Sequence, residues 1–351
     1  MRVLVTGHRG YLGTVLTPMM IAEGIEVVGL DSGLFERCGF GEPTIDVPQI
    51  KKDVRDARAS DMEGFDAVLH LAGLSNDPLG DFSPKLTYEI NHLASVSLAR
   101  LAKEAGVGRF VFSSSCSVYG KTEEEVINED ARHRPLTAYS WSKALAERDI
   151  VKLANANFNP TFLRSGTAYG MSPRLRFDLV LNNLTAWAVA TGRIHIKSDG
   201  TAWRPIVHIE DIARAFITAI RAPLDLVHNQ AFNVGRTDQN YRVRELAAIV
   251  EETVPGCRVE YAEDAGPDNR SYRVDCGKIA RALPEFKPRW DARLGAKQLC
   301  EAYLKAGLVV EDFEGVRYNR IKHIKWLIGE GHLDAGLRQK ETEPAWTGAQ
   351  V

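Results

Sequence analysis

The fold is decided by the stretch Arg2-Val3-Leu4-Val5-Thr6-Gly7-His8-Arg9-Gly10-Tyr11-Leu12-Gly13, close to the start of a chain of 351 residues. Its first five residues predict a short buried strand, and the glycines that follow predict a loop. After the loop, the pattern predicts a helix that continues to about Glu23 and is ended by Gly24. A second strand is expected over residues 26–30, with Asp31 directly after it.

A strand, a glycine loop, a helix, a strand and an acid in this order predict a dinucleotide-binding unit. The glycines Gly7, Gly10 and Gly13 allow the backbone to approach a pyrophosphate, which binds at the N-terminus of the helix. Asp31 stands 18 positions after Gly13, near the spacing that places a carboxylate on the adenosine ribose. Because this carboxylate accepts the 2′-hydroxyl and repels a 2′-phosphate, we expect NAD rather than NADP as the cofactor.

Further β/α units follow the first one. Strands are expected over residues 67–71, 109–114 and 161–164, and helices over residues 83–105 and 139–157. This alternation predicts an α/β fold with a Rossmann-type doubly wound parallel sheet. After residue 165 the pattern loosens, and a helix is expected over residues 174–190. We expect an NAD-binding domain at 1–165, a smaller substrate-binding lobe at 166–305 with some segments returning to the first domain, and a helical extension at 306–351 that is disordered from about residue 339.

The stretch from Ser113 to Lys143 carries the candidate chemistry. Its serines follow a short apolar run that predicts a buried strand, and open α/β sheets bind ligands at the carboxyl ends of their strands. Tyr139 and Lys143 are four positions apart, so on a helix their side chains lie on one face. A neighbouring ammonium lowers the pKa of a tyrosine, which is about 10 when free. With Ser115, this pair predicts a proton-transfer site for a sugar or alcohol hydroxyl. A serine-rich turn before an unrelated helix is the alternative.

Composition and charge exclude several classes of function. The chain is 44% hydrophobic and 26% charged with a net charge of −2, so neither a nucleic acid nor an anionic membrane is an expected partner. No apolar run is long enough to span a bilayer, and the first residues lead directly into a strand rather than a signal peptide. The five cysteines show neither metal nor disulfide spacing, which predicts free thiols in a cytoplasmic protein without a metal site.

Taken together, these residues resemble the extended short-chain dehydrogenase/reductases of the NAD-dependent nucleotide-sugar epimerase/dehydratase family. The resemblance covers roughly residues 1–305. It is carried by Gly7-x-x-Gly10-x-x-Gly13, Asp31, Asp53-Val54, His70-Leu71-Ala72-Gly73, Ser113 to Gly120, Tyr139-x-x-x-Lys143, Asn182-Asn183-Leu184, residues 198–213 and residues 268–275.

The resemblance implies NAD that is recycled within each turnover, a nucleoside-diphosphate sugar as substrate, and a homodimer formed through residues 83–105 and 139–157. In the catalytic set, Tyr139 takes the sugar proton, Lys143 keeps Tyr139 ionised, and Ser115 hydrogen-bonds the reacting oxygen. The implied cofactor contacts are Gly7, Arg9, Gly10, Tyr11, Leu12, Gly13, Asp31, Ser32, Asp53, Val54, Leu71, Ala72, Gly73, Asn91, Ser113, Tyr139 and Lys143. The implied substrate contacts are Ser75, Asn76, Ser115, Cys116, Ser117, Tyr139, Thr167, Asn183, Arg204 and Arg270. Asp53 is equally compatible with a surface turn, and Asn76 with a turn cap.

Three departures from the family pattern leave the reaction open. The 4,6-dehydratases of the family carry an Asp-Glu pair where Cys116 and Ser117 stand here. This argues against ordinary 4,6-dehydration, because a serine cannot act as the base and a thiol is a poor acid. In addition, Gly166-Thr167 replaces the usual Phe-Asn, and Ser75 stands where some 4-epimerases have a lysine. We predict an epimerase that acts at the 4-position through a transient keto-sugar. The alternative is a keto-sugar reductase or an atypical dehydratase in secondary-metabolite or polysaccharide biosynthesis.

Overall fold

The computed structural model describes residues 1–75, 77–121, 125–262, 266 and 271–340. Its centre is a seven-stranded sheet in the order β10-β6-β5-β4-β1-β2-β3, in which every pair is parallel. The strands are β1 (Arg2–Thr6), β2 (Glu26–Asp31), β3 (Gln49–Lys51), β4 (Ala67–His70), β5 (Arg109–Ser115), β6 (Asn159–Ser165) and β10 (Gln230–Val234). This confirms the predicted doubly wound, Rossmann-type sheet.

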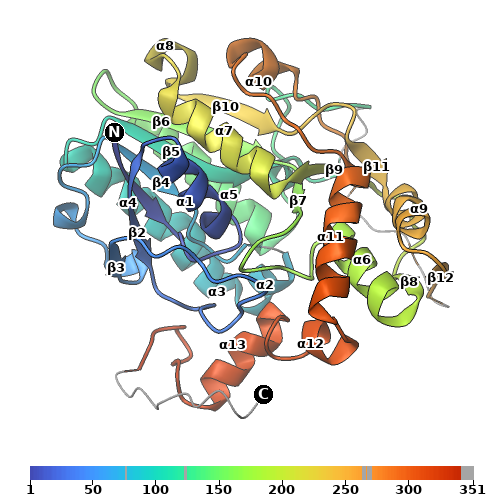
Figure 1. Cartoon of the computed structure of the whole chain (residues 1–351). Coiled ribbons are helices and arrows are strands. Elements are labelled where there is room, and N and C mark those ends of the chain that lie inside the picture. Colours follow the sequence, from blue (N-terminus) through green and yellow to red (C-terminus); the bar gives the residue numbers. More distant parts are fainter. Residues whose placement is uncertain (76, 122–124, 263–265, 267–270, 341–351) are drawn as a thin grey trace.

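Helices cover both faces of the sheet (Figure 1). On one face lie α1 (Gly13–Ala22) and α7 (Ile209–Arg221), and on the other α3 (Pro84–Thr87), the π-helical turn η3 (Tyr88–Leu93), α4 (Ala94–Glu104) and α5 (Ala138–Ile150). The two layers follow from the alternation of side chains along each strand. In β1, Val3 and Val5 pack into the core that includes α1 and α7, whereas Leu4 packs into the core that includes α4.

The second lobe consists of three helices and two small sheets, β11-β9-β7 and β12-β8. Its main elements are α6 (Val180–Thr191), α9 (Val243–Thr253), α11 (Ala292–Ala306), β7 (Thr167–Tyr169), β8 (Arg193–Ile196), β9 (Trp203–His208), β11 (Asn240–Arg242) and β12 (Arg258–Tyr261). Short turns are η1 (Val54–Asp56), η2 (Ala59–Asp61), α2 (Asp77–Phe82), η4 (Cys116–Tyr119), η5 (Val151–Leu153), α8 (Leu224–Val227) and α10 (Gly277–Ala282). Helix α7 and strand β10 return to the large sheet, where β10 pairs with β6.

Two expected helices are shorter in the structure than the sequence suggests. The helix expected over residues 174–190 begins only at Val180. Before it, Arg176 and Asp178 form an ion pair with each other, and side chains two positions apart do not face each other on a helix. The helix expected over residues 139–157 ends at Ile150 and continues only as the short turn η5.

The chain after residue 306 is less helical than expected. It forms α12 (Val310–Glu314) and α13 (Arg320–Gly329), followed by a turn closed by a bridge between Leu333 and Gln339. In Figure 1, α13 lies below the part of the sheet that carries β2 and β3, and it contacts α2. The end that we expect to be disordered falls largely outside the described residues, but Gln339 is placed and donates to the Ser32 carbonyl oxygen at 2.5 Å.

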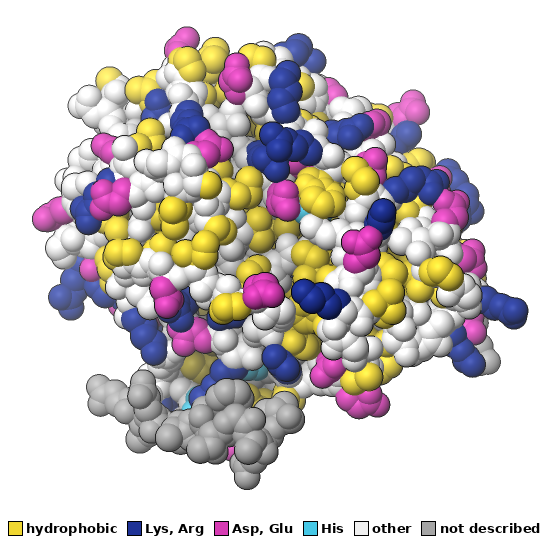
Figure 2. All heavy atoms as spheres, in the orientation of Figure 1, with side chains coloured by type: hydrophobic (Ala, Val, Ile, Leu, Met, Phe, Trp, Pro, Cys, Tyr) yellow, Lys and Arg dark blue, Asp and Glu magenta, His cyan; other side chains and the backbone are white. Residues whose placement is uncertain are grey.

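The surface carries charged side chains of both signs, and the thiols lie in the interior. Figure 2 shows acidic and basic side chains interspersed over one face of the molecule. All five cysteines are buried and free. Within the described ranges, no helix combines the length and the apolar character that a membrane span needs.

A buried ion pair joins α5 to the sheet. Arg164 in β6 donates through Nε and Nη2 to the Glu147 carboxylate in α5, at 3.1 and 2.7 Å. The two side chains are only 7% and 5% exposed. The Ser114 hydroxyl also donates to Glu147, and Arg164 Nη1 donates to the Tyr119 hydroxyl at 3.0 Å. Removing one member of a buried ion pair leaves an unpaired buried charge. Such a removal lowers the free energy of unfolding more than replacing both members with apolar residues does.

We expect Glu147→Ala to lower the free energy of unfolding by about 3–5 kcal/mol, because it leaves the Arg164 guanidinium buried without a counter-ion. Urea unfolding followed by circular dichroism measures this. The control is Glu89→Ala, which removes a pair with the largely exposed Lys85 at 3.9 Å and should change the free energy of unfolding by less than about 1 kcal/mol. Equal effects of the two substitutions would contradict a structural role for the buried pair.

Candidate active site

A cavity of about 1050 Å³ lies at the carboxyl ends of β1, β4, β5 and β6 and extends between the sheet and the second lobe. Open α/β sheets bind their ligands at this position. The predicted site residues that line it are Gly7, Arg9, Gly10, Tyr11, Leu12, Gly13, Asp31, Ser32, Asp53, Val54, Leu71, Ala72, Gly73, Ser75, Ser113, Ser115, Ser117, Tyr139, Thr167, Asn183 and Arg204. Lys143, Asn91 and Cys116 are not part of its surface, and Asn76 and Arg270 lie outside the described residues.

The glycine loop at residues 7–13 is tightly folded, and Gly7 lies against the chain that leaves β4. Neither Gly7 nor Gly13 has room for a side chain. Gly7 has a φ of +73°, and a Cβ there would lie 2.8 Å from the Ala72 amide nitrogen. A Cβ on Gly13, the first residue of α1, would lie 2.4 Å from the Gly7 carbonyl oxygen. The backbone at the start of α1 therefore stays open to an anion, as the diphosphate of a dinucleotide requires.

Asp31 ends β2 at the edge of the cavity. Its two carboxylate oxygens accept hydrogen bonds from the Arg9 and Gly33 amides, at 3.0 and 2.8 Å. The Arg9 guanidinium is paired with Glu36 at 2.7 Å rather than turned toward a phosphate. A fixed carboxylate beside a neutralised arginine fits the unphosphorylated adenosine ribose of NAD.

Two predicted cofactor contacts are occupied by the protein itself. The Asp53 carboxylate accepts from the Arg55 amide at 2.8 Å and pairs with the Arg55 guanidinium at 2.6 Å, so it caps the turn η1. The Asn91 side chain is fully buried in η3, where its amide group binds both the amide and the carbonyl of Leu74 at 2.8 Å. Asn91 therefore fixes the loop after β4 from behind the cavity wall.

Ser115 at the end of β5 and Tyr139 in the first turn of α5 form the reactive corner of the cavity. Their side chains share a hydrogen bond, which lowers the pKa of the phenol. Burial is the larger effect, however, and it raises the pKa of Tyr139 to about 12. In this state of the protein Tyr139 is therefore protonated at neutral pH.

Lys143 lies one turn further along α5, behind the tyrosine. Its Nζ donates to the Ser113 carbonyl oxygen at 2.7 Å and is 5.9 Å from the centroid of the Tyr139 ring. Burial lowers the pKa of Lys143 to about 8, against the opposing charge of Glu147. The predicted lowering of the tyrosine pKa by this ammonium is not seen: burial raises the pKa of Tyr139, and the positive charge that lowers it belongs to Arg176.

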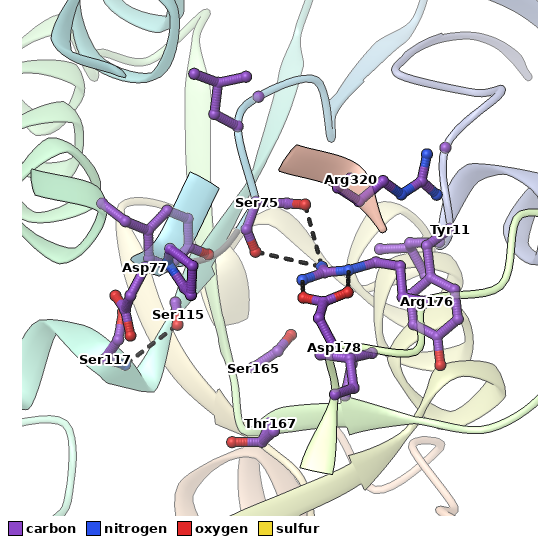
Figure 3. A pocket seen from close by; sticks show the side chains of 18 of the residues that line it. Tyr11, Ser75, Asp77, Ser115, Ser117, Ser165, Thr167, Arg176, Asp178 and Arg320 are labelled. Atoms are coloured by element: carbon purple, nitrogen blue, oxygen red, sulfur yellow. Dashed lines mark hydrogen bonds and ion pairs between the residues drawn. The ribbon is translucent and has the colours of Figure 1, made fainter. Parts of the chain in front are cut away.

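Arg176 and Asp178 occupy the middle of the cavity, and the sequence analysis did not find them (Figure 3). Their side chains pair at 2.5 Å, and Arg176 also donates to the Ser75 hydroxyl at 3.1 Å. A signal was available in the sequence, because charged and apolar residues alternate from 174 to 179. Alternation predicts an extended chain rather than a helix, with Leu175, Phe177 and Leu179 turned into the core.

The segment after β5 contains a buried thiol followed by a serine that lines the cavity. Cys116 is fully buried, its Sγ donates to the Arg164 carbonyl oxygen at 3.0 Å, and burial raises its pKa well above the usual range. Ser117 and Ser165 line the cavity, but the Oγ atom of each is buried and has no hydrogen-bond partner within the described part of the chain. Thr167, which also lines the cavity, can hydrogen-bond a hydroxyl group of a sugar (Figure 3).

Comparison with known proteins agrees with this geometry. A UDP-glucose 4-epimerase of Bacillus subtilis (strain 168) is 27% identical to this chain over 329 residues, covering 86% of the chain and 95% of the relative. The structure of a UDP-glucose-4-epimerase from Stenotrophomonas maltophila, with bound NAD and formylated UDP-arabinopyranose, is 27% identical with a TM-score of 0.76, covering 88% and 99% of the two chains. The structure of MoeE5 in complex with UDP-glucuronic acid and NAD is 28% identical with a TM-score of 0.75, covering 87% and 99%.

The strongest assignment comes from a family model that matches more than half of the chain. The model of the NAD dependent epimerase/dehydratase family matches residues 3–235. This match includes the glycine loop, Asp31, and the Ser115, Tyr139 and Lys143 side chains. The chain therefore belongs to the NAD-dependent epimerase/dehydratase family.

Proposed function

We propose that this protein is an NAD-dependent epimerase of a nucleoside-diphosphate sugar, acting at the 4-position through a transient keto-sugar. The observation that carries the proposal is the meeting of Ser115 and Tyr139 in the same cavity as the glycine loop and Asp31. The UDP-glucose 4-epimerases among the relatives support the choice of reaction. UDP-hexoses are therefore the first substrates to expect.

In this reaction NAD supplies a hydride acceptor that gives the hydride back within the same turnover. The protein moves the proton: Tyr139, as phenolate, takes it from the sugar 4-hydroxyl, and Ser115 holds the reacting oxygen. Because the pKa of Tyr139 is about 12 in the buried site, the phenolate needs nearby positive charge. Lys143, on the same face of α5, contributes that charge.

A keto-sugar reductase or an atypical dehydratase is the second candidate. Ordinary 4,6-dehydration is disfavoured, because Cys116 is turned away from the cavity and Ser117 is not an acid. The position of Asp77 supports the dehydratase alternative. It lines the cavity, and its charge raises the pKa of Tyr139.

We also infer a cytoplasmic homodimer. The five buried, free thiols agree with a reducing compartment. In the predicted dimer helices, Leu93 in η3 and Trp141 in α5 are 58% and 45% exposed, and the two elements contact each other. Large apolar side chains exposed on neighbouring helices are typical of a protein interface.

We expect the purified protein, without added cofactor, to convert one nucleoside-diphosphate hexose of a UDP, dTDP, GDP and CDP panel into an equilibrium mixture of two epimers, as followed by NMR. The matched control is Tyr139→Phe, which removes the proton acceptor while leaving the ring in place. This variant should retain its NAD but lose turnover by more than about 100-fold.

Three outcomes of that assay would contradict the proposal. A 4-keto or unsaturated product would indicate a dehydratase. Turnover only after addition of a keto-sugar and NAD(P)H would indicate a reductase. Full activity of Tyr139→Phe would remove the tyrosine from the proton transfer, whichever reaction is observed.

Light scattering should give twice the chain mass of 38.9 kDa. The double variant Leu93→Asp, Trp141→Glu should give a single chain mass, because it places charges in the apolar contact. The control is Leu304→Asp on α11, which changes an equally exposed leucine far from these helices in sequence and should leave the mass unchanged. A wild-type protein of single chain mass would refute the dimer.

A further inference from the structure

One wall of the cavity comes from the chain after residue 305, which the family resemblance does not cover. The residues of this segment that line the cavity are Phe313, Glu314, Tyr318, Asn319, Arg320, Ile321 and Leu337. Among them, Arg320 is the charged side chain that is most deeply enclosed, at 6% exposure. The extension therefore brings a buried positive charge to the cavity wall.

Arg320 is the first residue of α13, and its guanidinium is only partly satisfied by the protein. Its Nη2 donates to the Arg174 carbonyl oxygen at 3.1 Å, and its Cζ lies 4.0 Å from the centroid of the Phe35 ring. Its Nη1 is buried without a hydrogen-bond partner among the described residues. Over the same residues, no carboxylate oxygen lies within 4.0 Å of this guanidinium.

A buried guanidinium with an unused N–H and no paired carboxylate is unfavourable unless a ligand supplies a hydrogen-bond acceptor and a negative charge. Burial accordingly lowers the pKa of Arg320 to about 10. A guanidinium presents its N–H groups in a planar fork that matches the oxygens of a phosphate group. The chemistry of the side chain therefore indicates a phosphate-bearing ligand.

The position of Arg320 indicates which phosphate it meets. Its side chain lines the same cavity as Tyr11 of the glycine loop and Arg176, and Figure 3 draws these side chains together. Its charge interacts with those of Arg176 and Arg174, which lower its pKa, and with that of Asp178, which raises it. Arg320 is therefore one of three neighbouring arginines, and this concentration of positive charge suits the diphosphate of a dinucleotide.

Residues 336–339 of the extension lie against η1 and the end of β2. Arg338 pairs with Asp53 at 3.6 Å and with Asp56, and Arg55 donates to the Gly336 carbonyl oxygen at 2.9 Å. Between these contacts, Leu337 lines the cavity. This segment therefore lies beside Asp53, on the side of the cavity where the adenosine is expected.

We propose that the C-terminal extension is part of the cofactor site, with Arg320 binding the diphosphate of NAD and residues 336–339 forming the outer wall around the adenosine. This inference rests on the NAD site of the proposed function and adds a ligand from outside the region of family resemblance. It concerns cofactor binding alone, so it is independent of which sugar reaction the protein catalyses.

The test uses Arg320→Met, which keeps an unbranched side chain and removes the guanidinium with its charge. After bound nucleotide is removed with charcoal, the Kd values for NAD, ADP-ribose and adenosine are measured by calorimetry, with competition NMR for the weak ligand. We expect the Kd for NAD and for ADP-ribose to rise by about 10- to 100-fold, the range of one charge-assisted hydrogen bond. The Kd for adenosine, which has no phosphate, should not change.

Two variants control for damage to the fold. Arg320→Lys keeps the charge without the fork and should give an intermediate Kd for NAD. Arg317→Gln removes an exposed arginine of the same segment, which donates to the Gly39 carbonyl oxygen at 3.0 Å and does not line the cavity, and should bind NAD like the wild type. If Arg320→Met does not fold, Arg320→Lys decides the question by itself.

Three results would overturn the proposal. One is an unchanged Kd for NAD in Arg320→Met, or in Arg320→Lys if only that variant folds. Another is an equal loss of affinity for adenosine, which would make Arg320 a structural residue. The third is weaker binding of UDP to the NAD-loaded protein with NAD binding intact, which would assign the arginine to the sugar nucleotide. A wild-type protein that binds NAD but does not epimerise sugars would refute the proposed function and leave this inference standing.

Discussion

The structure depends on one close backbone approach, between the glycine loop and the chain that leaves β4. No Cβ fits at Gly7, which lies against Ala72 after β4, or at Gly13, which lies against the Gly7 carbonyl and His8, so the loop is folded tightly at the start of α1. β1, which leads into this loop, pairs with both β2 and β4, and this brings Asp31 to the same edge. The cofactor site therefore forms together with the centre of the sheet and is not a separate addition to the fold.

Helix α5 connects the central sheet to the candidate catalytic residues. Tyr139, Lys143 and Glu147 are spaced by four positions, so they form one stripe on the helix that faces the sheet. Glu147 is fixed by Arg164 of β6, and it also raises the pKa of Lys143. The ion pair that holds α5 in place thus supports the charge of the lysine behind the reactive tyrosine. Stability and the proposed proton transfer therefore depend on the same helix face.

The sequence predicts the sheet and the cofactor loop well, because both follow from short-range patterns: apolar runs, glycines and one acid. It places Ser115 and Tyr139 together for the same reason. It does not predict Arg176 and Asp178 in the cavity, since an expected helix concealed the alternating pattern that keeps them extended. The sequence also does not predict that Arg320 lines the cavity, because only the tertiary structure brings residue 320 into the same cavity as the loop at residues 7–13. The pKa of Tyr139 also depends on burial that no local spacing reveals.

In the proposed epimerase reaction, hydride leaves carbon 4 of the sugar and returns to the same carbon without leaving the site. This is tested with a nucleoside-diphosphate hexose carrying deuterium at carbon 4, incubated with the protein in ordinary water and analysed by NMR and mass spectrometry. We expect the epimer formed to keep its deuterium at carbon 4. Deuterium at carbon 6 of a deoxy keto-sugar, or in released reduced cofactor, would contradict it.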